Sequence, residues 1–324
     1  MASLPPICDP HFHFWDTETR PNPNLGGPAI AKYLPGDYKE DMAGMEVVRA
    51  LVLPGSRHRT PSPPPCAKLC GVHVEAIVGQ EPGGHELDAV DETRWVESLE
   101  GGMPRSLVVY AHLAHDDVDE VLAAHKAAST RVVGVRQILN HHPTDPSRTW
   151  PQVETGDWFT MPAFRAGFAK LKDHGLSFDL QCNPHQLEPA ATFLADFLDT
   201  PVIVNHLGCL TLGDDEAIAD WRRGMTALSK LPQVYVKLSF GARLAPKWWL
   251  EPDKAAELKA IILETVDLFG SARCMFASNF PVDKLFGLSA SDLYRGQFDM
   301  VKHLPEADVA NLFFATAAKV YRLE

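Results

Sequence analysis

Short apolar runs alternate with amphipathic segments along most of the chain. Eight of the runs have the length of a β-strand, and each ends in polar or ionisable residues. They cover residues 7–14, 72–78, 106–113, 132–137, 176–181, 201–208, 234–239 and 273–280. Continuous apolar runs of this length are typical of strands that are buried on both faces, as in a parallel sheet.

Amphipathic segments between these runs have the spacing of helices. The clearest begin at Asp116, Met161, Asp214 and Pro252. Residues that favour helix ends support them, with proline in the first turn, aspartate as an N-cap and glycine after the last turn. These residues are Pro162, Pro252, Asp214, Gly175 and Gly270.

Eight strands alternating with helices predict a (β/α)8 TIM barrel that occupies residues 1–324 as a single domain. A doubly wound open sheet is the alternative. No glycine-rich nucleotide-binding loop follows any of the predicted strands, which weakens that alternative.

A proline-rich stretch interrupts the pattern at residues 53–71, which contain five prolines. Such a composition favours extended or irregular backbone. We interpret the stretch as an insertion or surface loop within the barrel. A functional lid, or a segment that is absent from the mature protein, are the other two interpretations.

Composition and net charge limit the kinds of molecule that the protein is expected to bind. Hydrophobic residues make up 45% of the chain and charged residues 22%, as in globular proteins with a large core. The net charge of −12 disfavours nucleic acids and anionic membranes. Without a leader-like or membrane-spanning segment, we expect a cytoplasmic protein with a small-molecule substrate, and homo-oligomers are compatible with the sequence. The six cysteines are expected to be free thiols.

The stretch DPHFHFWD, residues 9–16, contains two histidines two residues apart. Alternate residues of a strand share a face, so His11 and His13 should point the same way. The pair is compatible either with hydrogen-bonded structural histidines or with ligands of a metal ion.

Polar residues recur at the carboxyl ends of the predicted strands. In chain order they are His11 and His13, His73 and Glu75, His112, Arg136 and Gln137, Gln181 with His185 just beyond, His206, Lys237, and Asn279 with Asp283. In a parallel barrel these ends form one mouth, where active sites are found. Convergence of several such residues favours a functional site there.

Eight segments in this order resemble the amidohydrolase superfamily: DPHFHFWD, VHVEA, ETRWVESL, GVRQILN, GLSFDLQ, NPHQ, VNHLG and CMFASNFPVDK. More narrowly, they resemble its amidohydrolase-2 branch, which includes sugar-acid lactonases and 2-pyrone-4,6-dicarboxylate lactonase. The resemblance implies that His11, His13 and His206 point into the mouth and that His185 matches a further family histidine. It also implies a divalent metal, usually zinc, held by the first three, although some lactonases of the branch work without a metal.

The chain departs from this family at the eighth strand, where the usual aspartate is replaced by Asn279. An amide cannot take a proton from the attacking water. That role is left open among Asp283, His206 and His185, with Asn279 orienting water or substrate.

A lactone is an activated ester, so we predict a hydrolase that opens a lactone, such as one of a sugar acid. Arg136, Gln181 and Lys237 are the predicted substrate-binding residues, with a structural ion pair as an equal alternative for Arg136 and a similar alternative for Lys237. Glu75 is interpreted as a residue of the mouth, as a salt-bridge partner of a neighbouring strand end or, as we favour, as a residue that supports the site without contacting substrate. A non-oxidative decarboxylase and a catalytically impaired binding barrel are the alternatives.

Overall fold

A computed structural model describes residues 3–22, 30–45, 70–76 and 89–323 of the chain. Its centre is a sheet of eight parallel strands that follow one another in chain order. The strands are β1 (Asp9–Phe12), β4 (Gly71–Val74), β5 (Ser106–Tyr110), β6 (Val132–Ile138), β7 (Ser177–Gln181), β8 (Val202–Val204), β9 (Val234–Leu238) and β10 (Cys274–Phe276). Each lies within or overlaps one of the eight predicted runs.

The sheet closes on itself between its first and last strands. Phe12 forms a parallel bridge with Phe280. The backbone N–H of Asn279 donates to the carbonyl of His11 at 2.8 Å, and that of His13 donates to Phe280 at 2.7 Å. The predicted (β/α)8 barrel is therefore confirmed.

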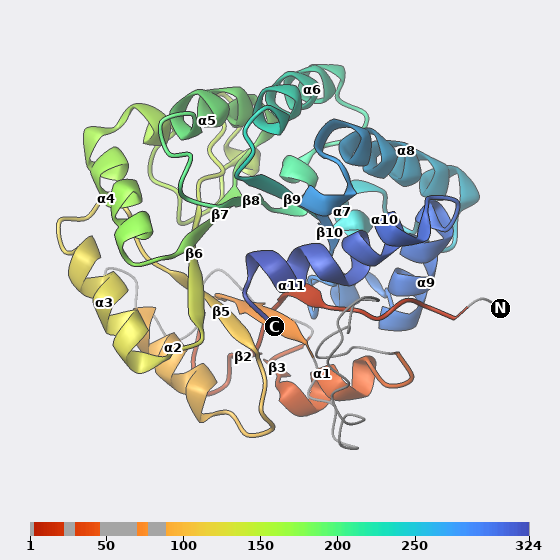
Figure 1. The fold of residues 1–324 in the computed structure, drawn as a ribbon, viewed down its shortest axis with the longest axis horizontal. Helices are drawn as coiled ribbons and strands as arrows, with labels where there is room; N and C mark the ends of the chain where they lie inside the picture. The colour runs from red at the N-terminus through yellow and green to blue at the C-terminus, as the bar shows by residue number, and fades with distance from the viewer. Residues whose placement is uncertain (1–2, 23–29, 46–69, 77–88, 324) are drawn as a thin grey trace, which may run out of the picture.

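Helices surround the strands (Figure 1). They are α1 (Pro35–Asp41), α2 (Ala89–Ser98), α3 (Val118–Ala128), α4 (Pro162–Asp173), α5 (Leu187–Leu194), α6 (Asp215–Ser229), α7 (Gly241–Leu244), α8 (Pro252–Phe269), α9 (Ala290–Val301), α10 (Glu306–Ala310) and α11 (Thr316–Val320). A small antiparallel pair, β2 (Trp15–Asp16) and β3 (Lys32–Tyr33), follows β1.

The structure confirms the predicted helix ends at Pro162, Pro252, Asp214 and Gly270. Pro162 and Pro252 open α4 and α8. The carboxylate of Asp214 caps α6 by accepting from the backbone N–H of Ala217 at 3.0 Å. Gly270 ends α8 with a φ of 77°, a conformation that side chains disfavour.

Alternate strand positions face two different apolar clusters. The larger cluster packs the helices onto the barrel and includes Val202 and Phe168. The smaller one includes Val108, Ile203 and Met275. This alternation is what a strand requires when both of its faces are buried.

Three further expectations concern membrane-spanning helices, the cysteines and the proline-rich stretch. Among the described residues, no helix has both the length and the apolar character needed to cross a membrane. The five described cysteines are buried free thiols, as expected. The proline-rich stretch 53–71 lies outside the described residues except for Cys70 and Gly71, so its interpretation stays a prediction.

Candidate active site

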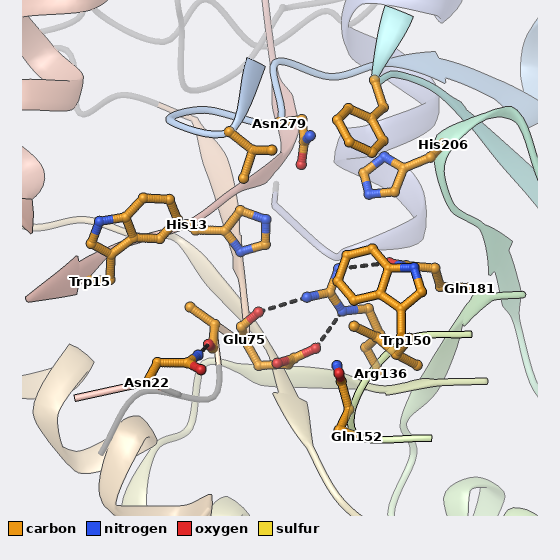
Figure 2. Close-up of a pocket in the computed structure, with 14 residues that line it drawn as sticks. His13, Trp15, Asn22, Glu75, Arg136, Trp150, Gln152, Gln181, His206 and Asn279 are labelled. Carbon is orange, nitrogen blue, oxygen red and sulfur yellow. Dashed lines mark hydrogen bonds and ion pairs between the residues drawn. The ribbon is translucent and has the colours of Figure 1, made fainter. Parts of the chain in front are cut away.

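A pocket with a volume of about 100 Å³ opens at the carboxyl ends of the strands. Polar side chains from several strand ends meet aromatic ones there (Figure 2). Its lining residues are His13, Trp15, Asn22, Glu75, Ala76, Arg136, Ile138, Trp150, Gln152, Gln181, His206, Phe240, Asn279 and Val282. The pocket therefore lies where active sites of this fold are found.

Three lining residues have a backbone conformation that is costly for side chains other than glycine. His206, Phe240 and Asn279 follow β8, β9 and β10 and have φ values of 55°, 61° and 56°. Left-handed backbone at such residues costs free energy and is concentrated at functional sites. Its repetition at three consecutive strand ends supports a role for this mouth in function.

His11 in β1 and His13 just after it form a hydrogen-bonded chain. Nε2 of His11 lies 3.2 Å from Nε2 of His13, and Nδ1 of His13 lies 2.8 Å from the carbonyl oxygen of Val74. Because a carbonyl only accepts, Nδ1 of His13 carries the proton and its Nε2 accepts from His11. Nδ1 of His11 then accepts from the Lys237 ammonium at 3.3 Å.

His206 completes the group of three histidines that the sequence predicts. Its ring centroid lies 4.6 Å from that of His11, and its Nδ1 lies 2.9 Å from the Ser239 hydroxyl. His13 and His206 line the pocket, whereas His11 is fully buried and lies outside the lining.

These histidines are neutral at physiological pH. Burial lowers the pKa of His11, His13 and His206 well below the usual range. The positive charge of Arg136 lowers all three further, and that of Lys237 lowers those of His11 and His206. The site therefore combines neutral imidazoles with two buried cations.

Arg136 and Glu75 form a buried ion pair at the pocket floor (Figure 2). Arg136 Nε donates to Oε1 of Glu75, its Nη2 donates to the Glu75 carbonyl at 2.7 Å, and its Nη1 donates to Oε1 of Gln181 at 3.1 Å. Arg136 thus both lines the pocket and forms the ion pair considered as its structural role. Glu75, expected to lie behind the site, lines the pocket.

Asp283 lies behind Asn279 and does not line the pocket. The Asn279 amide nitrogen donates to Oδ2 of Asp283 at 2.7 Å, and the Ala242 backbone N–H reaches Oδ1 at 3.3 Å. The amide oxygen of Asn279 therefore points toward the pocket, as Figure 2 shows. Asp283 orients Asn279 and has no direct access to a pocket ligand, which corrects its expected role in proton transfer.

Lys237 is also separated from the pocket, contrary to its expected role in substrate binding. Its side chain is 0% exposed and forms an ion pair with Asp179 inside the barrel, beneath His11. The Tyr321 hydroxyl donates to the same carboxylate at 2.9 Å. A substrate in the pocket cannot reach Lys237 without displacing His11.

His185 lies in a neighbouring cavity of about 350 Å³. His142 is its ring neighbour there, with centroids 5.2 Å apart. Trp150 lines both cavities, whereas His185 does not line the pocket at the strand ends. The predicted catalytic role of His185 is therefore not supported by its position.

The arrangement does not fit a metal ion held by His11, His13 and His206. Both ring nitrogens of His11 already have partners, and Nη1 of Arg136 lies 3.5 Å from its Nε2. A divalent cation there would lie beside a guanidinium and displace these hydrogen bonds. Across the described residues, no three His, Cys, Asp or Glu side chains are arranged to hold a metal ion.

Several residues of the pocket lining were not predicted from the sequence. Trp15 lies two residues after His13, and its position within DPHFHFWD was the one available signal. Trp150 and Gln152 belong to the irregular segment after β6, and Asn22 to the one after β2. Phe240 follows β9, but it is apolar, and the site was predicted only from polar residues at the strand ends.

Comparison with known proteins agrees with the fold. Residues 8–323 match the family described as Amidohydrolase. The uncharacterized protein y4mH of Sinorhizobium fredii is 32% identical, covering 98% of each chain. The L-fucono-1,5-lactonase of Burkholderia multivorans is 26% identical, covering 97% of this chain and 95% of that protein.

A solved structure shares the fold over the whole chain. It is an amidohydrolase from Burkholderia multivorans with bound zinc, 22% identical, with a TM-score of 0.74 and coverage of 99% of this chain and 100% of that one. The extent of the family match and the 32% identity to a full-length relative settle the family. The chain belongs to the amidohydrolase family, in its amidohydrolase-2 branch, and is a hydrolase.

Proposed function

We propose that the protein hydrolyses a lactone of a sugar acid. The observation that carries this proposal is a buried acceptor in the pocket wall: Oε1 of Gln152 has no hydrogen-bond partner among the described residues. A buried acceptor left without a donor is costly, so it favours a ligand that brings hydroxyl groups. The Asn279 oxygen is a second acceptor directed at the same space.

Aromatic side chains supply the complementary surface. Trp15, Trp150 and Phe240 line the pocket together with these amides, and Figure 2 shows Trp15 and Trp150 on opposite sides. A sugar-acid lactone has apolar C–H faces and polar edges. Flat aromatic walls with amide groups between them suit both. The lactonase name of one relative agrees with this substrate class.

The charges of the pocket suit attack on an ester carbonyl. The Arg136 guanidinium is fixed by Glu75 and Gln181 at the floor. As water attacks, negative charge develops on the carbonyl oxygen, and a fixed cation in a buried site stabilises it. Neutral His206, whose Nδ1 faces Ser239, leaves Nε2 for a hydrogen bond to substrate. No step of the proposal passes through a metal ion, because Arg136 and the partners of His11 oppose one there.

A titration at constant pH tests the proposal. Purified protein is mixed with a panel of five- and six-membered aldonolactones near neutral pH, and base consumption is compared with the spontaneous rate. We expect turnover of at least one lactone. If no lactone opens faster than the spontaneous reaction, the proposal is wrong. Release of carbon dioxide from aromatic carboxylic acids would instead favour the decarboxylase alternative.

A further inference from the structure

The hydrolysis needs a group that takes a proton from water, and two of the three candidates for it lie away from the pocket. Asp283 lies behind the Asn279 amide, and His185 lies in the neighbouring cavity. Among the described residues that line the pocket, two kinds of group remain: the histidines His13 and His206, and the carboxylate of Glu75.

The two oxygens of Glu75 have different surroundings. Oε1 accepts from Arg136 Nε, which fixes the orientation of the carboxylate. Oε2 is buried and has no hydrogen-bond partner among the described residues. Glu75 lines the pocket, and a carboxylate with one oxygen fixed and the other unpaired is suited to accept a hydrogen bond from a water molecule there.

The lining histidines are less suited to this role. Nδ1 of His13 donates to Val74, and its Nε2 accepts from His11, so both of its nitrogens are engaged. His206 has a free Nε2, but burial and the charges of Arg136 and Lys237 keep its imidazole a weak base. A neutral imidazole under these conditions is better suited to hydrogen bonding than to holding a proton.

We infer that Glu75 is the general base of the lactone hydrolysis proposed above. This assignment rests on that proposed function. The unpaired Oε2 of Glu75 takes the role of the aspartate that is missing at the end of the eighth strand. The water oxygen attacks the lactone carbonyl while one of its protons moves to Oε2. The carbonyl electron pair moves to oxygen, beside Arg136. As it returns, the ring C–O bond breaks, and the alkoxide that leaves takes the proton from Glu75. The products are a hydroxy acid, which ionises to its carboxylate, and a regenerated Glu75 carboxylate.

The charges around Glu75 set the pH range in which it acts. Burial raises its pKa from 4.5 to about 7, the Arg136 guanidinium opposes this rise, and Glu92 from α2 and Asp179 from β7 add to it. His13 faces the same pocket but is neutral. A base with a pKa near the working pH is effective in proton transfer, and activity should rise with pH through about 7 as the carboxylate ionises.

The test compares Glu75→Gln with Glu92→Gln, a matched control. Glu92 is also buried, but it accepts from Ala76 N–H at 2.7 Å and lies outside the pocket lining. We expect Glu75→Gln to lower kcat about 10²–10⁴-fold with little change in KM, and to abolish the rise of kcat with pH. Glu92→Gln should keep the maximal kcat and the rise of kcat with pH, with the midpoint of that rise at lower pH because the charge of Glu92 raises the pKa of Glu75. Formate added to Glu75→Ala should restore part of the rate.

The outcomes separate this assignment from the proposed function. If wild type opens lactones and Glu75→Gln retains its rate and its pH profile, the assignment to Glu75 is wrong and the lactonase proposal stands. If Glu75→Gln unfolds, as circular dichroism would show, Glu75→Asp is measured in its place. The assignment is contradicted if Glu75→Asp has the wild-type pH profile and formate does not restore the activity of Glu75→Ala. A wild type that opens no lactone overturns both.

Discussion

The side-chain nitrogen of Asn279 donates a 2.7 Å hydrogen bond to Oδ2 of Asp283, and both side chains are buried. The two residues act as one unit, because the bond determines which end of the amide faces the pocket. An aspartate at position 279, the residue expected from the family resemblance, would bring two carboxylates together here. The replacement by asparagine removes that repulsion and converts a proton acceptor into an oriented hydrogen-bonding group.

The first prediction concerns the pH dependence of stability. Burial raises the pKa of Asp283 from 3.8 to about 7. In the unfolded chain this carboxyl ionises near its ordinary pKa, so the folded state holds an extra proton between about pH 4 and 7, and stability falls with rising pH over that window. A neutral amide in place of this carboxyl resembles its protonated form and has no such loss.

We therefore expect Asp283→Asn to match wild type near pH 4 and to exceed it at pH 7 and above, by a few kcal/mol, since one pKa unit corresponds to about 1.4 kcal/mol. Urea unfolding at several pH values measures the difference. A constant difference between the two proteins across that range would contradict the burial of an ionisable Asp283.

The second prediction contrasts two histidines that the sequence places in the same role. His206 lines the pocket, and His185 lies in the neighbouring cavity. We expect His206→Asn to lower kcat for lactone opening about 10²-fold, because it removes a hydrogen bond to the reacting group. His185→Asn should retain the wild-type kcat. Steady-state kinetics of both variants decide this, and the reverse order would place the reaction in the other cavity.

The third prediction concerns the ion pair inside the barrel. Removing one partner of a fully buried pair leaves an uncompensated charge. We expect Lys237→Met to lower the free energy of unfolding by about 3–5 kcal/mol, because among the described residues Asp179 would keep the Tyr321 hydroxyl as its one side-chain donor. The double variant Lys237→Met with Asp179→Leu should be more stable than the single one. Equal stability of Lys237→Met and wild type in urea unfolding would show that the pair is not buried as described.

The fourth prediction concerns metal. Arg136 and the engaged nitrogens of His11 oppose a divalent ion at the histidines. We expect protein purified without chelators to contain far less than one zinc per chain by elemental analysis. Dialysis against a chelator should leave lactone opening unchanged. One tightly bound zinc that is lost in His11→Ala, together with loss of activity, would contradict the account.

The barrel could be predicted because strands buried on both faces leave continuous apolar runs. The convergence of His11, His13 and His206 followed from the same reasoning, since parallel strands end at one mouth. Helices such as α5 and α9 were not predicted individually.

Side-chain direction at the strand ends could not be predicted. Lys237 pairs in register with Met275 within the sheet, so its side chain enters the barrel interior below the mouth. Asn279 has a left-handed backbone, which determines that it faces the pocket in place of Asp283. Sequence spacing alone does not specify such turns, and irregular segments such as the one with Gln152 have no periodic signal.

The contribution of substrate hydroxyl groups tests the central claim most directly. A six-membered aldonolactone and δ-valerolactone share the reacting ring, but only the first carries hydroxyls for the acceptors of Gln152 and Asn279. The account predicts that kcat/KM, corrected for the spontaneous rates, favours the aldonolactone by about 100-fold or more, with most of the preference lost in Gln152→Leu. Equal values for the two lactones, or a preference for δ-valerolactone, would contradict it.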